Sequence, residues 1–171
     1  MYAVDENDTV VELADLPQSA VGAPLPCVFA NEWRTFLAYY LQDTSPGWDG
    51  TSVRVLDLDS DKERVAIISF VGCHAQMFGP PNDEAFRGHP LAARGLGPYR
   101  VFRIENSSWV RALERMNAVH PYHKPERILG LSHFIFMFHD STFECVASGY
   151  KIAVHEGSIR SAMARVLVEA G

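Results

Sequence analysis

The chain has 171 residues, of which 47% are hydrophobic and 21% charged, and its net charge is −6. This composition is that of an ordinary globular protein, and a chain of this length can fold without a disulfide or metal. The negative charge and the scattered basic residues argue against a nucleic-acid partner, because phosphate binding needs clustered Lys and Arg. We expect one domain over residues 1–171, with residues 1–26 as an acidic, proline-containing lead-in.

Cysteine usage and the terminus indicate the compartment. Cys27, Cys73 and Cys145 are odd in number, widely spaced and set among apolar neighbours, which is typical of reduced thiols. The first residues are acidic where a secretory signal would be basic and then apolar. No apolar stretch approaches the roughly 20 residues that cross a bilayer. The expected location is therefore cytoplasmic, with no membrane partner.

The first half of the chain alternates between short apolar segments and polar turns. Val10 and Val11 suggest a short strand in the lead-in. Residues 27–41 fit both a helical and an alternating pattern, and their aromatic content favours a strand before a turn at 45–50. Residues 52–58 alternate and are followed by a polar turn and a long apolar segment, residues 64–78. We expect these two segments to form a hairpin.

The second half begins with a loop over residues 79–98, about 20 residues long, whose apolar members favour an ordered conformation. A strand is expected over 99–104. The polar segment 106–108 offers N-cap side chains to a helix that Pro121 stops. Residues 133–139 and 143–154 predict a second hairpin, and a last helix follows Gly157.

Strands in hairpins, with the two helices separated by a hairpin, predict an α+β fold. We expect a mostly antiparallel β-sheet built from hairpins, with two or three helices packed on it. A doubly wound parallel sheet would need a helix between successive strands, and neither GxGxxG nor GxxxxGK[ST] occurs.

The densest group of reactive side chains lies between Cys73 and His89. Imidazoles, adjacent carboxylates and an arginine occur together there, and histidine can act as an acid, a base or a ligand near neutral pH. The candidate residues are His74, Asp83, Glu84, Arg87 and His89. A structural interpretation stays open, in which Asn82 or Asp83 caps a turn and Arg87 pairs with a neighbouring carboxylate.

A second candidate lies at the later hairpin. If Ser141 and Thr142 form a two-residue turn, His139 faces Glu144 across the ladder, close enough for a hydrogen bond. Strand alternation places His133 and His139 on one face, and the phenylalanines of 134–138 with Cys145 on the other, which must be core. The histidine face is then a semi-polar layer or the floor of a pocket, and His139 and Glu144 complete the candidate set.

Other chemistries have weaker signals. The sequence contains no CxxC pair and no HExxH motif, so we expect neither a metal nor another cofactor. Cys145 lies on the expected core face, and adjacent strand residues such as Cys73 and His74 point to opposite faces. Ser141 lacks the GxSxG context of a nucleophile elbow.

Two functions remain open. The first is a binding domain for a small molecule or a protein, including a possible homodimer, because no catalytic signature occurs and aromatic residues are frequent. The alternative is a small acid/base or metal-assisted hydrolase that uses the His74/Glu84/His89 loop and the His139/Glu144 hairpin. Whether the protein is an enzyme is therefore open, and convergence of these residues would favour the second function.

Overall fold

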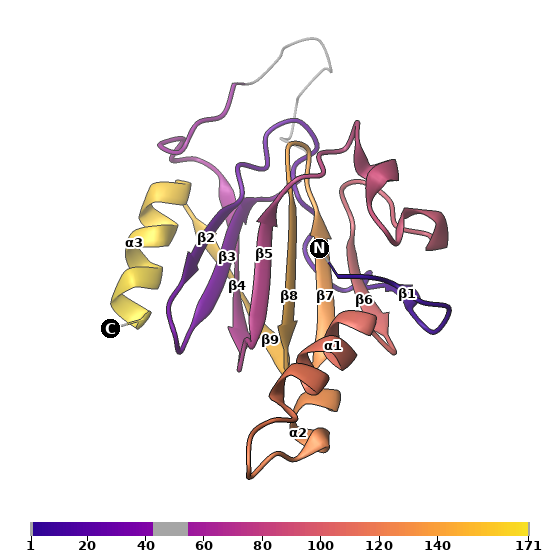
Figure 1. The fold of residues 1–171 in the computed structure, drawn as a ribbon. Helices are drawn as coiled ribbons and strands as arrows, with labels where there is room; N and C mark the ends of the chain where they lie inside the picture. Colours follow the sequence, from indigo (N-terminus) through magenta and orange to yellow (C-terminus); the bar gives the residue numbers. More distant parts are fainter. Residues whose placement is uncertain (1, 43–54, 171) are drawn as a thin grey trace. The chain divides into compact units, whose positions relative to one another are not determined.

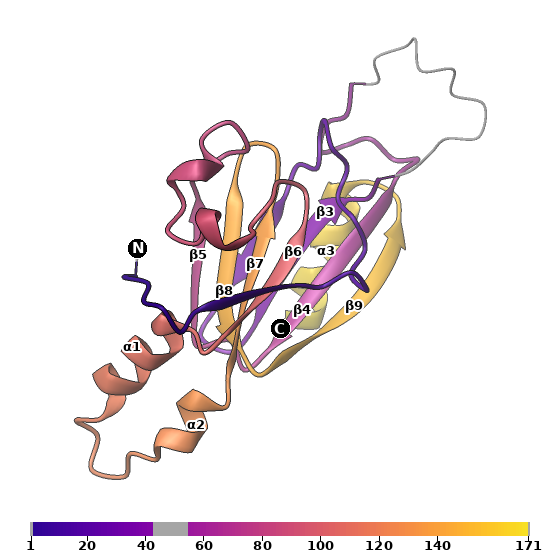
Figure 2. The same ribbon diagram turned by 90° about the vertical axis from the view of Figure 1, so that its right-hand side faces the viewer.

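Two structural units share the chain in an interleaved order. The computed structural model describes residues 2–42 and 55–170. Unit 1 consists of Met1–Leu16 and Val71–Gly149, and unit 2 consists of Pro17–Phe70 and Tyr150–Gly171. Figures 1 and 2 show the elements of each unit, which are described separately below.

Unit 1 is built on a five-stranded sheet whose neighbouring strands are antiparallel. The strands, in their order across the sheet, are β1 (Thr9–Glu12), β6 (Val101–Glu105), β7 (Ser132–Met137), β8 (Thr142–Ala147) and β5 (Ala75–Gly79). The helices are α1 (Ser108–Asn117) and α2 (Pro125–Leu129), with two 3₁₀ turns, η1 (Phe86–Gly88) and η2 (Ala92–Arg94). The central strands β7 and β8 are buried almost throughout, so both of their faces are packed.

One face of this sheet carries the polar residues of interest. The loop 79–98 packs on it through Leu91 and Leu96, which contact Phe102, Ile135 and Met137. Nearer the other end of these strands, α1 and α2 cover the same face, and Trp109, Val110 and Ile128 cluster there with Val146. The expected ordered loop is therefore confirmed: its apolar side chains form part of the core, and η1 and η2 lie within it.

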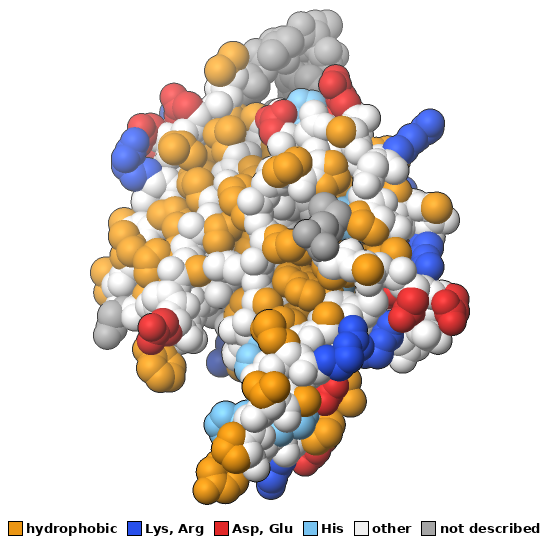
Figure 3. Space-filling model, in the orientation of Figure 1, with side chains coloured by type: hydrophobic (Ala, Val, Ile, Leu, Met, Phe, Trp, Pro, Cys, Tyr) orange, Lys and Arg blue, Asp and Glu red, His pale blue; other side chains and the backbone are white. Residues whose placement is uncertain are grey.

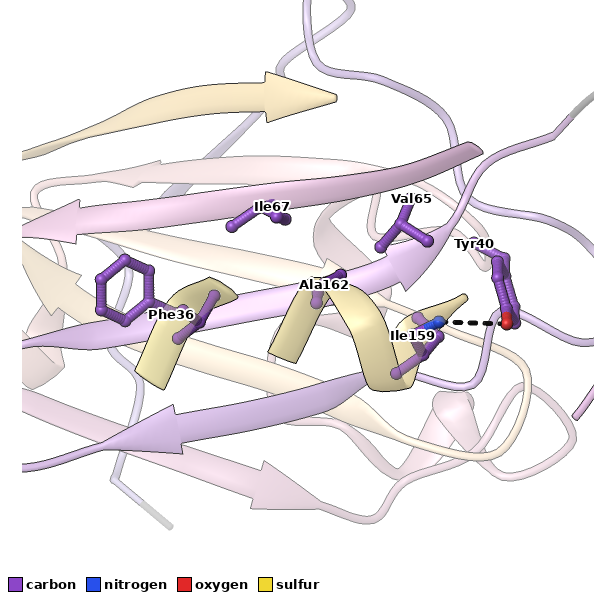
Figure 4. Packing of buried hydrophobic residues seen from close by; sticks show 8 residues of the cluster. Phe36, Tyr40, Val65, Ile67, Ile159 and Ala162 are labelled. Carbon is purple, nitrogen blue, oxygen red and sulfur yellow. Dashed lines mark hydrogen bonds between the residues drawn. The ribbon is translucent and has the colours of Figure 1, made fainter. Parts of the chain in front are cut away.

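Unit 2 contains a four-stranded sheet and one helix. Its strands are β2 (Cys27–Ala30), β3 (Thr35–Tyr40), β4 (Arg64–Val71) and β9 (Gly149–Glu156), and they adjoin in that order. The helix α3 (Ile159–Ala170) covers the sheet with a stripe of Ile159, Ala162 and Val166. Figure 4 shows this stripe against Phe36, Tyr40, Val65 and Ile67. The Tyr40 hydroxyl accepts a hydrogen bond of 3.1 Å from the backbone N–H of Ile159, which anchors the start of the helix.

The α+β class is confirmed, but several elements differ from the sequence-based expectation. The apolar segment 64–78 is two strands, β4 and β5, which belong to different sheets. The chain breaks between them at Gly72, whose φ of 56° lies in the left-handed region that interrupts a strand. Likewise, the expected strand 143–154 divides into β8 and β9, which also lie in different sheets. A glycine lies at each break, Gly72 in the first segment and Gly149 in the second.

The expected hairpin of 52–58 with 64–78 is wrong for the residues that the structure describes, whereas residues 52–54 lie outside them. Residues 55–58 form no strand, because the side chain of Asp57 accepts a hydrogen bond from the Asp59 backbone N–H and holds a turn. β4 instead lies between β3, with which it forms an antiparallel pair, and β9. The ambiguous segment 27–41 is a hairpin of β2 and β3, and the Asn31 side chain accepts from the backbone N–H groups of Trp33 and Arg34 in its turn. The turn expected at 45–50 lies outside the described residues.

The remaining elements agree with expectation. The short strand at Val10 and Val11 is β1, and the strand expected over 99–104 is β6. Ser107 is the N-cap of α1, as the polar segment 106–108 predicted. Among residues 2–42 and 55–170, no helix has the length and apolar character needed to cross a lipid bilayer. The single domain over residues 1–171 stays a prediction.

Candidate functional site

A buried carboxylate, Glu144, forms the centre of a polar cluster inside unit 1. Its Oε1 lies 3.1 Å from Nε2 of His89, and its Oε2 lies 3.0 Å from Nε2 of His133. The hydroxyl of Tyr2 donates to the same Oε2 over 2.8 Å. The side chains of both histidines are fully buried, and that of Glu144 is 4% exposed. The cluster joins the N-terminal segment, the loop 79–98, β7 and β8.

The hydrogen bonds fix where the protons lie. The backbone N–H of Leu91 donates to Nδ1 of His89 over 3.1 Å, so neutral His89 carries its proton on Nε2 and donates it to Glu144. His133 has Glu144 on its Nε2 and the hydroxyl of Ser107 on its Nδ1, 2.9 Å away. When Nε2 donates to the carboxylate, Nδ1 is the acceptor for the Ser107 proton. The carboxylate therefore accepts from His89, His133 and Tyr2.

This arrangement holds the carboxylate ionised and the imidazole neutral. Burial alone would raise the pKa of Glu144, but the hydrogen bonds from His133 and His89 outweigh it and lower that pKa to about 2. Burial lowers the pKa of His133, because the charged imidazolium loses its hydration. Burial, reinforced by the charge of Glu144, raises the pKa of the Tyr2 hydroxyl, which stays protonated.

Aromatic rings hold the His133 imidazole in place. Tyr2 and Trp109 stack with their centroids 5.3 Å apart, and each meets His133 edge-on, at 5.2 Å and 5.0 Å respectively. Edge-to-face contacts of this kind are favourable and restrict ring rotation. With hydrogen bonds on both nitrogens as well, the orientation of the imidazole is fixed.

A second polar cluster lies at the turn between β7 and β8. Nδ1 of His139 lies 2.8 Å from Oδ2 of Asp83, and the Tyr99 hydroxyl donates to the same carboxylate oxygen. The backbone N–H of Asp83 donates to the carbonyl of His139 over 2.9 Å, so main chain and side chains bind the loop to the turn. The His139 side chain is 40% exposed. Tyr99 itself has a φ of 61°, an uncommon conformation for a bulky residue.

The charges of this second cluster are mutually stabilising. The hydrogen bond from Tyr99 lowers the pKa of Asp83, with a further contribution from His139. In turn, the hydrogen bond to Asp83 raises the pKa of His139. Burial and the Asp83 carboxylate together raise the pKa of Tyr99 to about 12. His139 and Asp83 thus form a partly exposed ion pair that joins the loop to the turn between β7 and β8.

The candidate residues named from the sequence fall into three groups. His89 and Glu144 meet in the buried cluster, and Asp83 and His139 meet in the half-exposed one. The remaining three are exposed and enter neither set of hydrogen bonds; they are His74, Glu84 and Arg87. The seven residues therefore do not form the one hydrogen-bonded site that the hydrolase alternative required.

The expected pairing of His139 with Glu144 is wrong. Residues 138–141 lie outside the ladder, so Thr142 pairs with Met137 and Glu144 pairs with Ile135. Ile135 and His133 are two residues apart on β7, so their side chains point to the same face, and Glu144 lies beside His133 there. The alternation itself was predicted correctly, because Phe134 pairs with Cys145 on the opposite face. The histidine face is a semi-polar layer beneath the loop and α1.

Four residues of these clusters were missed as site residues: Tyr2, Tyr99, Ser107 and His133. Ser107 and His133 each carried a partial signal, one as a helix cap and the other as a histidine on the same strand face as His139. Tyr2 and Tyr99 gave none, because their partners are 142 and 16 residues away along the chain. Only the folded chain brings such groups together.

A surface pocket of about 340 Å³ opens next to the buried cluster. It lies between β6, the first turn of α1 and the segment from α2 into β7. Its polar lining comprises Arg103, Glu105, Asn106, Ser107, Arg111 and Ser132, and its apolar lining comprises Ile104, Val110, Leu129 and Leu131. Ser107 therefore belongs both to the pocket wall and to the buried network.

Exposed apolar side chains gather beyond this pocket. Met116, Val119 and Tyr122 are largely exposed at the end of α1 and in the connection to α2 (Figure 3). The frequent aromatic residues that suggested a binding function differ in exposure: Trp33 is 82% exposed, whereas Tyr39, Tyr40 and Trp109 are buried. Trp48 lies outside the described residues. Within residues 2–42 and 55–170, the side chains of Met116, Val119 and Tyr122 are left exposed.

Metal ligands and thiols are the other groups that could supply chemistry. No group of three or more His, Cys, Asp or Glu residues in the described part of the chain is placed to hold a metal ion. None of the three cysteines forms a disulfide, and burial raises the pKa of the Cys145 thiol, which makes it a poor nucleophile. The reactive groups of the two polar clusters are histidines, carboxylates and hydroxyls.

No family model, no curated protein and no solved structure matches the chain.

Proposed function

We propose that this chain is a ligand-binding domain whose pocket between β6, α1 and α2 takes a small organic anion with an apolar part. The observation that carries the proposal is the pocket itself, about 340 Å³ and lined by two arginines above an apolar surface. Pockets for small molecules combine an apolar lining with a few polar groups that fix orientation. This volume is at the lower end of the range typical for such sites.

The charges around the pocket favour an anion. Arg103 and Arg111 line it together with a single carboxylate, Glu105. Arg103 pairs with Glu105 over 2.8 Å, but both side chains are more than 40% exposed. An exposed ion pair of this kind stabilises little, so the guanidinium can turn to a ligand at low cost. Guanidinium groups bind carboxylates and phosphates in a two-point geometry.

The donors of Arg111 and of the first turn of α1 are already occupied. The Arg111 guanidinium contacts Asp5 at 2.5 Å and also donates to the carbonyl of Asn106. In the first turn of α1, the backbone N–H of Ser108 donates to Asp8 and that of Val110 to the Ser107 side chain. Recognition of an anion would therefore depend mainly on Arg103, with Arg111 adding positive charge.

The pocket can be tested with small probes of known charge. We expect benzoate, hexanoate or phenyl phosphate, at about 10 mM, to shift the backbone amide signals of Val110 and Leu131 in NMR spectra, as weak ligands of this size do. Benzamide, which has the same ring without the charge, should shift them less. The proposal is overturned if none of the three anions moves these signals.

A matched pair of variants tests the role of the arginine. Arg103→Ala should weaken the anion about 5- to 10-fold, because one charge-assisted hydrogen bond is lost. The control is Arg100→Ala. Arg100 is also an exposed arginine paired with a glutamate, Glu12, at 2.9 Å, but it does not line the pocket. Equal weakening by both variants would show a general charge effect instead of a site.

A further inference from the structure

Ser107 occupies an unusual position at the pocket. It lines the wall, and it precedes the first residue of α1 as the N-cap, accepting a hydrogen bond of 3.3 Å from the backbone N–H of Val110. Its hydroxyl also meets Nδ1 of the buried His133 at 2.9 Å. Asn106, which precedes it, has a φ of 50°, and this left-handed turn directs the chain from β6 into the helix.

The proton arrangement polarises this hydroxyl. Because Nε2 of His133 donates to the Glu144 carboxylate over 3.0 Å, Nδ1 is left as an acceptor, and the Ser107 hydroxyl is the donor that faces it. The carboxylate is held in turn by His89 at 3.1 Å and Tyr2 at 2.8 Å. Serine, imidazole and carboxylate therefore form a continuous relay from the pocket wall into the core.

We propose that Ser107 is the nucleophile of an ester-cleaving site in this pocket, with His133 as its proton acceptor and Glu144 as the residue that positions His133. The inference rests on the ligand pocket proposed above and names its substrate class. The substrates are small carboxylic esters that carry an anionic group for Arg103. A serine activated by a base that a third group orients is the general form of such sites.

The reaction balances with the residues present. The Ser107 oxygen forms a bond to the ester carbonyl carbon while its proton passes to Nδ1 of His133. The carbon–oxygen bond of the ester breaks, and the leaving alcohol takes that proton from His133. A water molecule then gives a proton to Nδ1 and adds to the acyl carbon. The acyl–serine bond breaks, the serine oxygen recovers the proton from His133, and a carboxylic acid leaves.

The relay differs in one respect from the well-known serine proteases. Here Nδ1 faces the serine and Nε2 faces the carboxylate, whereas those enzymes use the two ring nitrogens in the opposite way. The roles depend on geometry and not on which nitrogen is used. The contacts of His133 with Tyr2 and Trp109 keep the ring from turning, so its proton acceptor stays aligned with Ser107.

The test is covalent labelling with an alkyl fluorophosphonate, which reacts with activated serines. We expect mass spectrometry to place the adduct on Ser107 of the wild-type chain. Ser107→Asp keeps an N-cap acceptor for α1 and should abolish that adduct. His133→Gln should slow labelling about 100-fold, the lower range for loss of a general base. Ser158→Ala removes another buried serine next to a helix, α3, and should change nothing.

A second measurement needs no variant and so does not depend on folding. The wild-type labelling rate should rise with pH in one step below pH 6.5, because burial lowers the pKa of His133 from that ordinary value. The titratable groups facing this imidazole are Tyr2, Asp8, His89 and Glu144. A rate without such a step, no adduct on Ser107, or full-rate labelling of His133→Gln overturns the inference.

The outcomes also separate this inference from the proposed function. If the anionic probes bind the pocket but Ser107 stays unlabelled, the ester-cleaving site is rejected and the binding function stands. If neither binding nor labelling occurs, both are rejected. Hydrolysis of the mono-4-nitrophenyl ester of succinate, which carries a free carboxylate for Arg103, should show an initial burst that is absent in Ser107→Asp, and this burst would report the acyl–serine step directly.

Discussion

The Nε2 of His89 lies 3.1 Å from the Oε1 of Glu144, although 55 residues separate them in the chain. This contact fixes the loop 79–98 to the central strand β8 through two fully desolvated groups. A carboxylate buried in this way is costly unless every lone pair that faces the protein finds a donor. Here His89, His133 and Tyr2 supply those donors.

Replacing Glu144 by glutamine should destabilise the protein markedly. The amide loses the charge and turns an N–H group toward a donor that needs an acceptor, so we expect a loss of about 3 kcal/mol in the free energy of unfolding. Urea denaturation followed by circular dichroism measures it. Glu12→Gln, which alters an exposed ion pair with Arg100, should stay within about 0.5 kcal/mol of wild type. A loss below that of the control would mean that the buried network contributes nothing.

Acid should unfold the protein through the same cluster. The folded pKa of Glu144, about 2, is below its ordinary 4.5, so its contribution to stability is complete above that value and is lost as the pH falls toward 2. The folded pKa of His133 is also lowered, from 6.5, which makes the unfolded chain the better proton acceptor below that pH. Both shifts therefore reduce the free energy of unfolding as the pH falls.

The urea midpoint should therefore decrease continuously from about pH 6.5 downward. In His133→Gln the step nearest neutral pH should be smaller than in wild type, with the lower step retained. A midpoint that rises on acidification between pH 6.5 and 4.5 would contradict the assignment of a neutral His133.

In the half-exposed cluster, the pKa of His139 is shifted upward, opposite to the downward shift of His133. NMR titration of the His139 ring should give a pKa above 6.5, because the Asp83 carboxylate stabilises the imidazolium through its hydrogen bond. Asp83→Asn should lower this pKa. Asp140→Asn is the matched control, since Asp140 is 85% exposed and its carboxylate lies 3.9 Å from Nε2. An equal decrease in both variants would mean that general charge, and not the hydrogen bond, sets the pKa.

The break between β4 and β5 predicts a sensitivity at Gly72. Alanine there would adopt a φ of 56°, and its Cβ would meet the Ser148 hydroxyl at 3.2 Å. We expect Gly72→Ala to lower the free energy of unfolding by about 1–2 kcal/mol. Gly88→Ala is the control, because its φ is not left-handed and no atom lies within 4 Å of the added carbon. Thermal unfolding of the two variants compares them directly.

Periodicity and capping signals predicted the fold class and most of the strands. The alternation of 133–139 was sufficient to separate the phenylalanine face from the histidine face, because side chains on a strand point alternately to its two sides. The N-cap of α1 was likewise visible at residues 106–108. The division of the segment 64–78 between two sheets was missed, although Gly72 and the polar residues His74 and Gln76 mark it, because a glycine inside a strand pattern is also compatible with a bulge in one strand.

The site was predicted less completely, for a physical reason. Grouping reactive residues by their nearness in the sequence placed His89 and Asp83, which enter the two polar clusters, together with His74, Glu84 and Arg87, which are exposed. Their actual partners, Glu144 and His139, come from a distant hairpin. Which of them meet depends on the ladder register, and the long turn at 138–141 shifted that register from the expected one.

The interleaving of the two units constrains how the chain can be made. Each unit contains an early and a late segment, so unit 1 lacks β6, β7 and β8 until residues 101–147 have left the ribosome. Unit 2 in turn lacks β9 and α3 until residue 170. Neither unit can complete its sheet until the late strands β8 and β9 have been synthesised. Until then, the incomplete sheets expose strand edges that can pair wrongly. Folding should therefore be late and concerted, and no simple truncation should yield either unit alone.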